Sequence, residues 1–406
     1  MTPEDRLLLL LGRGTFTEDL HERALALVGG ASWSQLLERS EAHGVAPLVG
    51  RNLDRLGWPG VPRHIREAFE AARRLNAARS LIAVRALRQL LDGLGRARIP
   101  VIPLKGTSLA ESLYGDPALR VSSDIDVLVP RDAAASAFAV LASLGYAPET
   151  GEPAVAADDM ELLLEGNIEY AFGHPAGSAG PVELHWDIAW RWPGGPAAVA
   201  DLWADARPRR AHGSPSLALG PEWELLYLAV HAARHRWAAL KWLVDVHEVC
   251  VRGALDWDSL RDKAARFRLG NVLGITLGAC RALFGTSKLP AHAVRMPPSW
   301  LRLFPAAPGP SDIWRGALYP TRLFPRLSDK LTYLGRVLLA PTLAERRSIR
   351  LPARLAVLYY PLRPIRLAGR WGLETTGAGL RQFRADGRSD RTRRRGARKP
   401  SNSLTG

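Results

Sequence analysis

Two apolar runs joined by a glycine-centred turn constrain the fold of this chain more than any other stretch of its sequence. Residues 99–104 lead into a Lys-Gly-Thr turn at 105–107, and residues 124–129 read Asp-Ile-Asp-Val-Leu-Val. Short apolar runs bounded by turn residues are typical of buried strands. We therefore expect strands over residues 99–104 and 124–129, with a helix over residues 108–114 between them.

The second of these strands carries Asp124 and Asp126. Side chains two residues apart on a strand point to the same face, so we expect the two carboxylates side by side. Such carboxylates repel each other unless one is protonated or a cation lies between them. The expected cation is Mg²⁺, which prefers oxygen ligands and also accepts phosphate oxygens. A solvated turn at the end of a strand is the alternative interpretation of this pattern.

A later strand, expected over residues 182–186, carries Glu183 and His185 on one of its faces. Both side chains would face the aspartates if the two strands are neighbours. Glu183 is then a candidate third carboxylate, although a surface glutamate would fit the same pattern. His185 could orient a carboxylate or contact substrate, and a buried histidine with a structural hydrogen bond is the alternative. Lys105 is a candidate charge partner for phosphate, with a solvated lysine as the alternative.

As a constellation, these motifs resemble the uncharacterised nucleotidyltransferase family of the polymerase-β-like superfamily. The resemblance covers roughly residues 70–250. The residues that carry it are Leu104-Lys105-Gly106, Leu109-Ala110, Leu113-Tyr114, Asp116-Pro117, Arg120, the run 124–129, Gly145-Tyr146 and Glu183-Leu184-His185-Trp186.

The resemblance implies an α+β fold with a polymerase-β-like nucleotidyltransferase core sheet. It also implies a separate role for each group of site residues. Gly106 and Thr107 match the turn that holds the phosphates of a nucleotide. Asp124, Asp126 and Glu183 match the carboxylates that bind the metal, with two Mg²⁺ ions as one option. The implied donor is an NTP, expected to be ATP.

The length of 406 residues predicts several domains or segments. We place their boundaries at stretches rich in Pro or Gly and at runs of charged residues. The expected units are an N-terminal helical region (1–97), the nucleotidyltransferase-like core (98–190), a linker or loop (191–219), a helical domain (220–340), a basic amphipathic segment (341–380) and a disordered basic tail (381–406).

Within these units, apolar spacing predicts finer detail. Residues 65–94 are expected to form one long helix, or two closely joined, with a buried stripe that includes Leu81. Residues 131–144 are expected to form a helix that stops at Gly145. Residues 162–172 are expected to form a hairpin across 165–167.

Residues 222–250 are expected to be strongly helical, and a break near Arg236 is the alternative to one continuous helix. At about 100° per residue, His231, His235, Trp242 and Asp245 would share one stripe, which such a break would disrupt. These side chains could line a substrate pocket. The His-x3-His spacing could also bind a transition metal, and a polar seam between packed helices is the third interpretation.

Charge is concentrated near the C-terminus. Residues 341–406 hold 16 Lys or Arg and four Asp or Glu, so most of the formal charge of +15 belongs to them. Such a segment favours anionic partners, either nucleic acid or lipid headgroups, and residues 351–367 mix apolar and basic residues as interfacial helices do. Two cysteines predict no disulfide framework. With no signal peptide and no spanning segment evident, we expect a cytoplasmic protein with a peripheral membrane contact as an option.

The leading functional hypothesis is a Mg²⁺-dependent nucleotidyltransferase that moves a nucleoside monophosphate from an NTP to an acceptor and releases pyrophosphate. One alternative is a non-catalytic nucleotide-binding or antitoxin-like module. Another is an RNA-directed nucleotidyltransferase, which the basic tail favours. The identity of the acceptor does not follow from the sequence.

Overall fold

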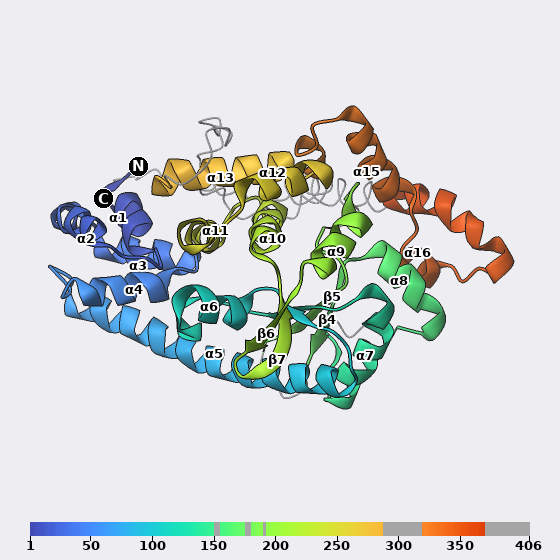
Figure 1. Ribbon diagram of the computed structural model, residues 1–406, viewed down its shortest axis with the longest axis horizontal. Helices are drawn as coiled ribbons and strands as arrows, with labels where there is room; N and C mark the ends of the chain where they lie inside the picture. The colour runs from blue at the N-terminus through green and yellow to red at the C-terminus, as the bar shows by residue number, and fades with distance from the viewer. Residues whose placement is uncertain (150–154, 175–179, 190–191, 287–318, 370–406) are drawn as a thin grey trace, which may run out of the picture.

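A five-stranded mixed sheet forms the centre of this α+β chain in the computed structural model, which describes residues 1–149, 155–174, 180–189, 192–286 and 319–369. Helical regions precede and follow the sheet in sequence. The long helix α5 runs along one side of the molecule, and helices α10 to α13 lie on the opposite side, with the sheet between them (Figure 1). The N-terminal helices α1 to α4 pack together at one end (Figure 1).

The sheet has the strand order β1-β2-β5-β4-β3. Strands β2 and β5 are parallel neighbours, and the other pairs are antiparallel. The strands are β1 (Ile102–Pro103), β2 (Ile125–Leu128), β3 (Ala147–Pro148), β4 (Glu169–Gly173) and β5 (Val182–His185). The expected strands over 99–104, 124–129 and 182–186 are therefore present, in shorter form.

The N-terminal region is helical, as predicted. A capping box stabilises the N-terminus of its first helix: the side chains of Thr2 and Asp5 each accept a hydrogen bond from the backbone N–H of the other. The helices are α1 (Pro3–Leu11), α2 (Glu18–Leu25), η1 (Val28–Gly30), α3 (Trp33–Ala42), α4 (Ala46–Arg55) and α5 (Arg63–Arg96).

The predicted long helix is the single helix α5, but the predicted burial of one residue of its stripe is wrong. Leu81 is 72% exposed. Its neighbour Ser80 occupies the inward position instead, where its hydroxyl donates to the carbonyl of Pro117 at 3.1 Å. One turn earlier, Asn76 donates to the carbonyl of Ala118 at 2.6 Å. The middle of α5 therefore holds a loop through polar contacts, whereas its first turns bury Ile65 and Phe69 and its last turns bury an apolar stripe.

Each face of the sheet has its own covering. One face packs the end of α5, α7 (Ala134–Ser143) and α8 (Met160–Gly166) against Ile125 and Val127 of β2. The other face carries Asp126, Glu183 and His185. Between β1 and β2 the chain forms α6 (Gly106–Tyr114) and η2 (Pro117–Leu119), and η3 (Arg131–Ala133) and η4 (Ala157–Asp159) precede α7 and α8. The predicted helix before Gly145 is confirmed, and Gly145 has φ +88°.

The predicted hairpin over residues 162–172 is wrong in its first half. Residues 160–166 form helix α8, which buries Leu163 and Leu164 side by side in the core. The indole N–H of Trp186 donates to the carbonyls of Leu164 and Asn167 at 3.1 and 2.9 Å, so it satisfies the end of the helix. Only β4 forms a strand in this stretch.

Residues 191–219, expected to be a linker or loop, contain regular structure. They hold α9 (Gly195–Ala204), with Pro196 in its first turn, and a separate hairpin of β6 (Arg207–Ala211) and β7 (Ser214–Ala218). His212 and Gly213 between these strands have φ +47° and +87°. Positive φ at both central residues is the requirement of a two-residue hairpin turn whose twist matches the strands. The turn residues His212 and Gly213 were the sequence signal that the linker prediction missed.

The C-terminal region continues with helices. The expected helical stretch over 222–250 is present, with the break that was considered near Arg236: α10 (Pro221–Arg234) ends where Arg236 and Trp237 adopt φ values of +54° and +53°. The later elements are α11 (Leu240–Arg252), α12 (Trp257–Arg266), α13 (Gly270–Phe284), η7 (Tyr319–Arg322), α15 (Leu327–Leu339), α16 (Leu343–Ser348), η8 (Ala353–Leu358) and a helix over 359–369. The basic tail over 381–406 lies outside the described residues. Among the helices of the described ranges, none combines the length and apolarity needed to cross a bilayer.

Candidate active site

Asp126 lies at the centre of the candidate active site. It occupies the second position of β2, and its side chain is completely buried (0% exposed). Asp124 lies just before the same strand and is 20% exposed. Its carboxylate accepts a hydrogen bond from the Ser122 hydroxyl at 3.2 Å. We expected the two aspartates on one face of the strand. Their burial differs: the Asp126 carboxylate is buried, and the Asp124 carboxylate is partly exposed.

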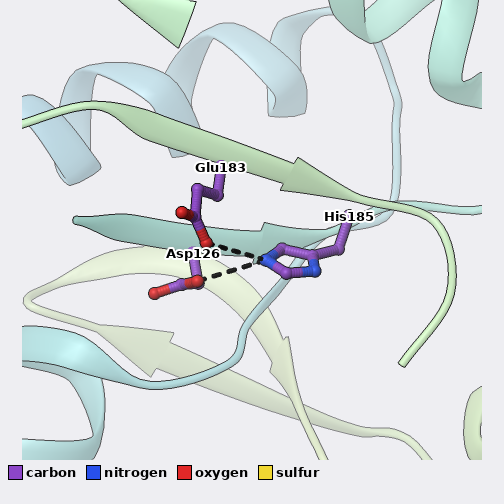
Figure 2. Close-up of side chains that lie close together, drawn as sticks. All are labelled: Asp126, Glu183 and His185. Carbon is purple, nitrogen blue, oxygen red and sulfur yellow. Dashed lines mark hydrogen bonds and ion pairs between the residues drawn. The ribbon is translucent and has the colours of Figure 1, made fainter. Parts of the chain in front are cut away.

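The parallel pairing of β2 and β5 brings the other predicted residues beside Asp126. Asp126 lies opposite Glu183 in the strand register. His185 Nε2 is 3.1 Å from Asp126 Oδ1 and 3.7 Å from Glu183 Oε2. The three side chains converge on one point above the sheet (Figure 2). The condition set from the sequence, that the two strands are neighbours, is met, and Glu183 and His185 lie beside Asp126 as expected in that case.

Lys105 lies between the two aspartates. Its Nζ is 3.2 Å from Asp124 Oδ2 and 2.9 Å from Asp126 Oδ1, and the lysine is 7% exposed. From the sequence we expected either a cation between these carboxylates or protonation of one of them. In this structure the chain's own ammonium group fills that role.

Charge balance at the site follows from these contacts. Burial opposes ionisation of Asp126, but Lys105 and His185 outweigh it and hold the pKa of the Asp126 carboxyl far below its usual range. Burial also opposes protonation of His185, yet hydrogen bonds to Asp126 and Glu183 raise its pKa to about 9. For Lys105, burial is outweighed by the carboxylates of Asp126 and Asp124, and its pKa is raised. An anionic Asp126 thus lies between two cationic groups.

The same residues have the donor atoms of a metal site. Asp126, Glu183 and His185 each offer one ligand atom, and these atoms all lie within 4.8 Å of one another. Asp126 Oδ2 is buried and has no hydrogen-bond partner among the described residues, so one lone-pair-bearing oxygen is left for a further ligand. Carboxylate oxygens suit Mg²⁺, and an imidazole nitrogen suits Mn²⁺ or Zn²⁺ as well. The residues present fit a divalent cation.

The glycine turn lies against this cluster. Gly106 begins helix α6 with φ +69°, and a Cβ there would lie 3.3 Å from Ser122 Oγ and 3.5 Å from the Asp124 carbonyl oxygen. Its lack of a side chain therefore permits both the backbone conformation and the close approach. Thr107 follows with 6% exposure. The first N–H groups of α6 lie next to the acidic residues, where a helix can bind an anion.

The residues predicted on the 222–250 stripe divide into two groups. His231 and His235 have ring centroids 4.7 Å apart, and His235 stacks on Trp242 at 4.7 Å. Burial lowers the pKa of both histidines, to about 4 for His235 and well below its usual value for His231, and Lys105 also lowers both. This aromatic group survives the break between α10 and α11.

Asp245 belongs to a different contact. Its carboxylate accepts hydrogen bonds from Arg120 Nε at 2.9 Å and from the Tyr114 hydroxyl at 2.8 Å. Arg120 Nη2 is also 2.9 Å from Asp245 Oδ2, and the two side chains are 3% and 1% exposed. This buried pair ties the segment after α6 to α11, and it occupies the Asp245 carboxylate that was predicted for a substrate pocket.

One pair at the site was absent from the predictions. Glu169 lies opposite His185 across the β4–β5 pairing, and its Oε2 is 3.1 Å from His185 Nδ1. Arg234 of α10 forms an ion pair with Glu169 through both of its terminal nitrogens. The alternation of strand β4 could have indicated which face Glu169 occupies, but only the strand order places it beside His185.

Comparisons with known proteins identify the family. A family model described as an uncharacterised nucleotidyltransferase matches residues 29–285. Among solved structures, an antigenic nucleotidyltransferase-like protein from Paracoccidioides brasiliensis is similar over 50% of this chain and 97% of its own, with 17% identity and a TM-score of 0.29. That likeness is too distant to support an argument about the fold. No curated protein matches the chain.

Proposed function

We propose that this chain, which belongs to the family of uncharacterised nucleotidyltransferases, moves a nucleoside monophosphate from an NTP to an acceptor hydroxyl and releases pyrophosphate. The observation that carries the proposal is the meeting of Asp126 with Glu183 on parallel strands, beside Asp124 and the glycine turn. Transfer of a phosphoryl or nucleotidyl group depends mainly on positioning and on neutralising charge. The site offers residues for both tasks.

Asp124, Asp126 and Glu183 would hold Mg²⁺, and His185 would hold the Asp126 carboxylate in place at 3.1 Å. Bound Mg²⁺ supplies neutralisation of the phosphate charge and a fixed orientation for the reacting oxygens. Lys105, already within 3.2 Å of both aspartates, would contribute positive charge toward the phosphates. Gly106 and Thr107 would donate backbone N–H groups to the phosphate oxygens.

Glu183 is the residue proposed to take the proton from the acceptor hydroxyl. His185 lowers the pKa of Glu183, but burial and the negative charge of Asp126 oppose this, and the net pKa is raised. A carboxylate with a raised pKa is a better proton acceptor. Glu183 is 28% exposed, so an incoming hydroxyl group can reach it.

The non-catalytic binding module has one observation in its favour. Lys105 already neutralises Asp124 and Asp126 without a metal. In such a module the lysine would hold the carboxylates permanently, and the pocket would bind a nucleotide without turnover. The RNA-directed alternative and a peripheral membrane location both depend on the basic C-terminal residues, most of which lie outside the described ranges.

Transfer can be tested without knowing the acceptor. The protein, Mg²⁺ and each of the four NTPs labelled at the α-phosphate would be incubated with a small-molecule extract of cells. The proposal expects a new labelled product from the wild type, with release of unlabelled pyrophosphate, and no such product from the Glu183→Gln variant. Tight binding of Mg²⁺-nucleotide with no labelled product from any extract would favour the binding module.

A further inference from the structure

A mostly apolar cavity of about 460 Å³ opens next to the candidate active site. Its walls come from β4, from Ile188, Ala189 and Trp192 after β5, and from α10, α13, η7 and α15. Trp192, Tyr319 and Tyr333 are its aromatic wall residues. Cavities of roughly 300–1,000 Å³ with apolar walls and a few polar groups are typical sites for small molecules.

The cavity reaches the catalytic cluster through Glu169. This residue lines the cavity, and its Oε2 lies 3.1 Å from His185 Nδ1. Arg234, which also lines the cavity, is ion-paired with Glu169. A molecule in the cavity would therefore lie against Glu169. Glu169 contacts His185, and His185 contacts Asp126.

Arg236 gives the cavity a second cation with a different role. Its guanidinium lies 5.4 Å from the centre of the Tyr319 ring. Within the described ranges, no carboxylate lies at ion-pair distance from Arg236, whereas Arg234 is held by Glu169. Arg236 and Trp237 both have positive φ, and the indole of Trp237 is anchored by its hydrogen bond to Thr276 at 2.9 Å. The break between α10 and α11 thus presents an arginine without an acidic partner to an apolar cavity.

We propose that this cavity binds the acceptor, and that the acceptor is a small molecule with an apolar, ring-sized body and an anionic group, a carboxylate or a phosphate. The apolar body packs against Trp192, Tyr319 and Tyr333, and the anionic group pairs with Arg236. This assignment of the acceptor rests on the proposed function. The hydroxyl oxygen of the acceptor forms a bond to the α-phosphorus of the NTP, and its proton passes to Glu183. The bond from the α-phosphorus to the bridging oxygen breaks, and pyrophosphate leaves with that electron pair.

The binding part of the proposal can be tested with a matched pair of fluorescent probes. The anionic probe is 8-anilinonaphthalene-1-sulfonate, and N-phenyl-1-naphthylamine has the same ring skeleton without the sulfonate. Titrations would use the full chain as wild type, Arg236→Gln and Ala233→Phe. Ala233 lines the cavity, and a phenylalanine there would fill part of it. Arg63→Gln, a change at an exposed arginine of α5, is the matched control.

Saturable binding of the anionic probe is expected in the wild type and in Arg63→Gln. Arg236→Gln should weaken the anionic probe about tenfold and leave the neutral probe unchanged, since a charge-assisted contact is lost. Ala233→Phe should weaken both probes, with circular dichroism checking that the variant folds. Displacement of the anionic probe by phenyl phosphate or by phenylacetate then separates the two anionic groups. An affinity for the anionic probe that does not change in Arg236→Gln, or no saturable binding at all, would overturn the proposal.

The labelled-nucleotide reaction separates failure of this inference from failure of the proposed function. A labelled product that Arg236→Gln forms with the same acceptor KM as the wild type would remove the cavity as the acceptor site, while transfer itself stands. Probe binding that depends on Arg236, together with no labelled product, would leave the cavity as a ligand site and reject the transferase.

Discussion

Lys105 is the residue that most directly connects stability with function in this protein. It holds a buried carboxylate at 2.9 Å and a partly exposed one at 3.2 Å. A cation at that position stabilises the protein when no metal is bound, and it would also meet the phosphates of a bound nucleotide. In the proposed function, Lys105 would therefore have to exchange partners on metal binding.

The variant Lys105→Met tests this exchange. Loss of the charge-assisted contact should lower the free energy of unfolding in metal-free buffer by about 2 kcal/mol, because His185 is then the one cationic partner of Asp126 among the residues that the structure describes. Addition of Mg²⁺ should restore more stability to the variant than it adds to the wild type. Urea denaturation with and without Mg²⁺ measures both effects. Nucleotide affinity should also fall, and an unchanged affinity would remove Lys105 from the nucleotide site.

Asp245 is expected to act on stability rather than on substrate. Its carboxylate is held by Arg120 and Tyr114 in a buried cluster. The variant Arg120→Met leaves a buried carboxylate without its charge partner, which costs about 3–5 kcal/mol. A large drop in the urea midpoint is the expected result. A stable Arg120→Met variant with altered substrate affinity would instead return Asp245 to the substrate pocket.

At the residue scale, strand alternation predicted which side chains share a face. The meeting of Asp126 with Glu183 and His185 also required the two strands to be neighbours, which the sequence analysis stated as a condition and the family resemblance favoured. Glu169 was missed because its place beside His185 depends on which strand is the neighbour of β5. Asp245 was assigned to a pocket because helical spacing shows which residues share a face and does not show which buried partner that face meets.

Among the elements, the turn between β1 and α6 determines how closely the backbone approaches Asp124. Gly106 has φ +69°, and a Cβ at this position would lie 3.3 Å from Ser122 Oγ. An alanine there would be strained in its backbone, at a cost of about 1–2 kcal/mol, and would press on the loop that carries Asp124. The Gly106→Ala variant should therefore lose both stability and nucleotide affinity.

Gly95 in α5 provides the control for this change. Nothing lies within 4 Å of a Cβ built at Gly95, and it has no positive φ. Gly95→Ala should leave stability unchanged or raise it by about 0.5–1 kcal/mol, because alanine is the better helix former. Thermal unfolding of the two variants side by side measures the difference. Equal behaviour of the two variants would show that the turn conformation of Gly106 is not required.

Elements were predicted well where a long period repeated and poorly where an end had to be located. The 34-residue helix α5 repeats its apolar spacing over many turns. In contrast, Leu163 and Leu164 fit a short strand as well as a helix, and the contact of Trp186 with the end of α8 cannot be seen in local sequence. The break near Arg236 was considered from the sequence, and the structure shows its form: Arg236 and Trp237 adopt positive φ, and the Trp237 indole donates to Thr276.

On the scale of the whole molecule, buried neutral histidines should make stability depend on pH. Burial lowers the pKa of His43 and of His247 to about 4. In the unfolded chain both would titrate near their ordinary value of about 6.5. Between these values the unfolded state binds protons that the folded state does not, so the free energy of unfolding falls as the pH is lowered from about 6.5 toward 4.

The variant His247→Asn separates this contribution from that of the acidic residues. His247 contacts the Thr286 hydroxyl at 2.9 Å, far in sequence from the catalytic strands. Urea midpoints at neutral pH and at about pH 5 should differ less in this variant than in the wild type. The same pH dependence in both proteins would contradict the assignment of a buried neutral imidazole to this position.

The range of the family match covers the candidate active site and part of the cavity beside it. The family match spans residues 29–285, which include the sheet, the aromatic group of α10 and α11, and part of the cavity wall. Tyr319 and Tyr333, which complete that wall, lie beyond the matched range. The residues proposed to hold the metal and the nucleotide therefore belong to the part that the family shares, and part of the proposed acceptor cavity is formed by residues that follow it.

The most direct measurement is a thermal-shift panel of ATP, GTP, CTP and UTP, each with and without Mg²⁺, on the wild type and on Asp126→Asn. A ligand that binds only the folded state raises the unfolding midpoint by mass action. A rise that requires Mg²⁺ in the wild type and is lost in Asp126→Asn is the predicted result, and the nucleotide that produces it is the donor. No rise with any nucleotide, or a rise of equal size in Asp126→Asn, would contradict a metal-dependent nucleotide site built on Asp126.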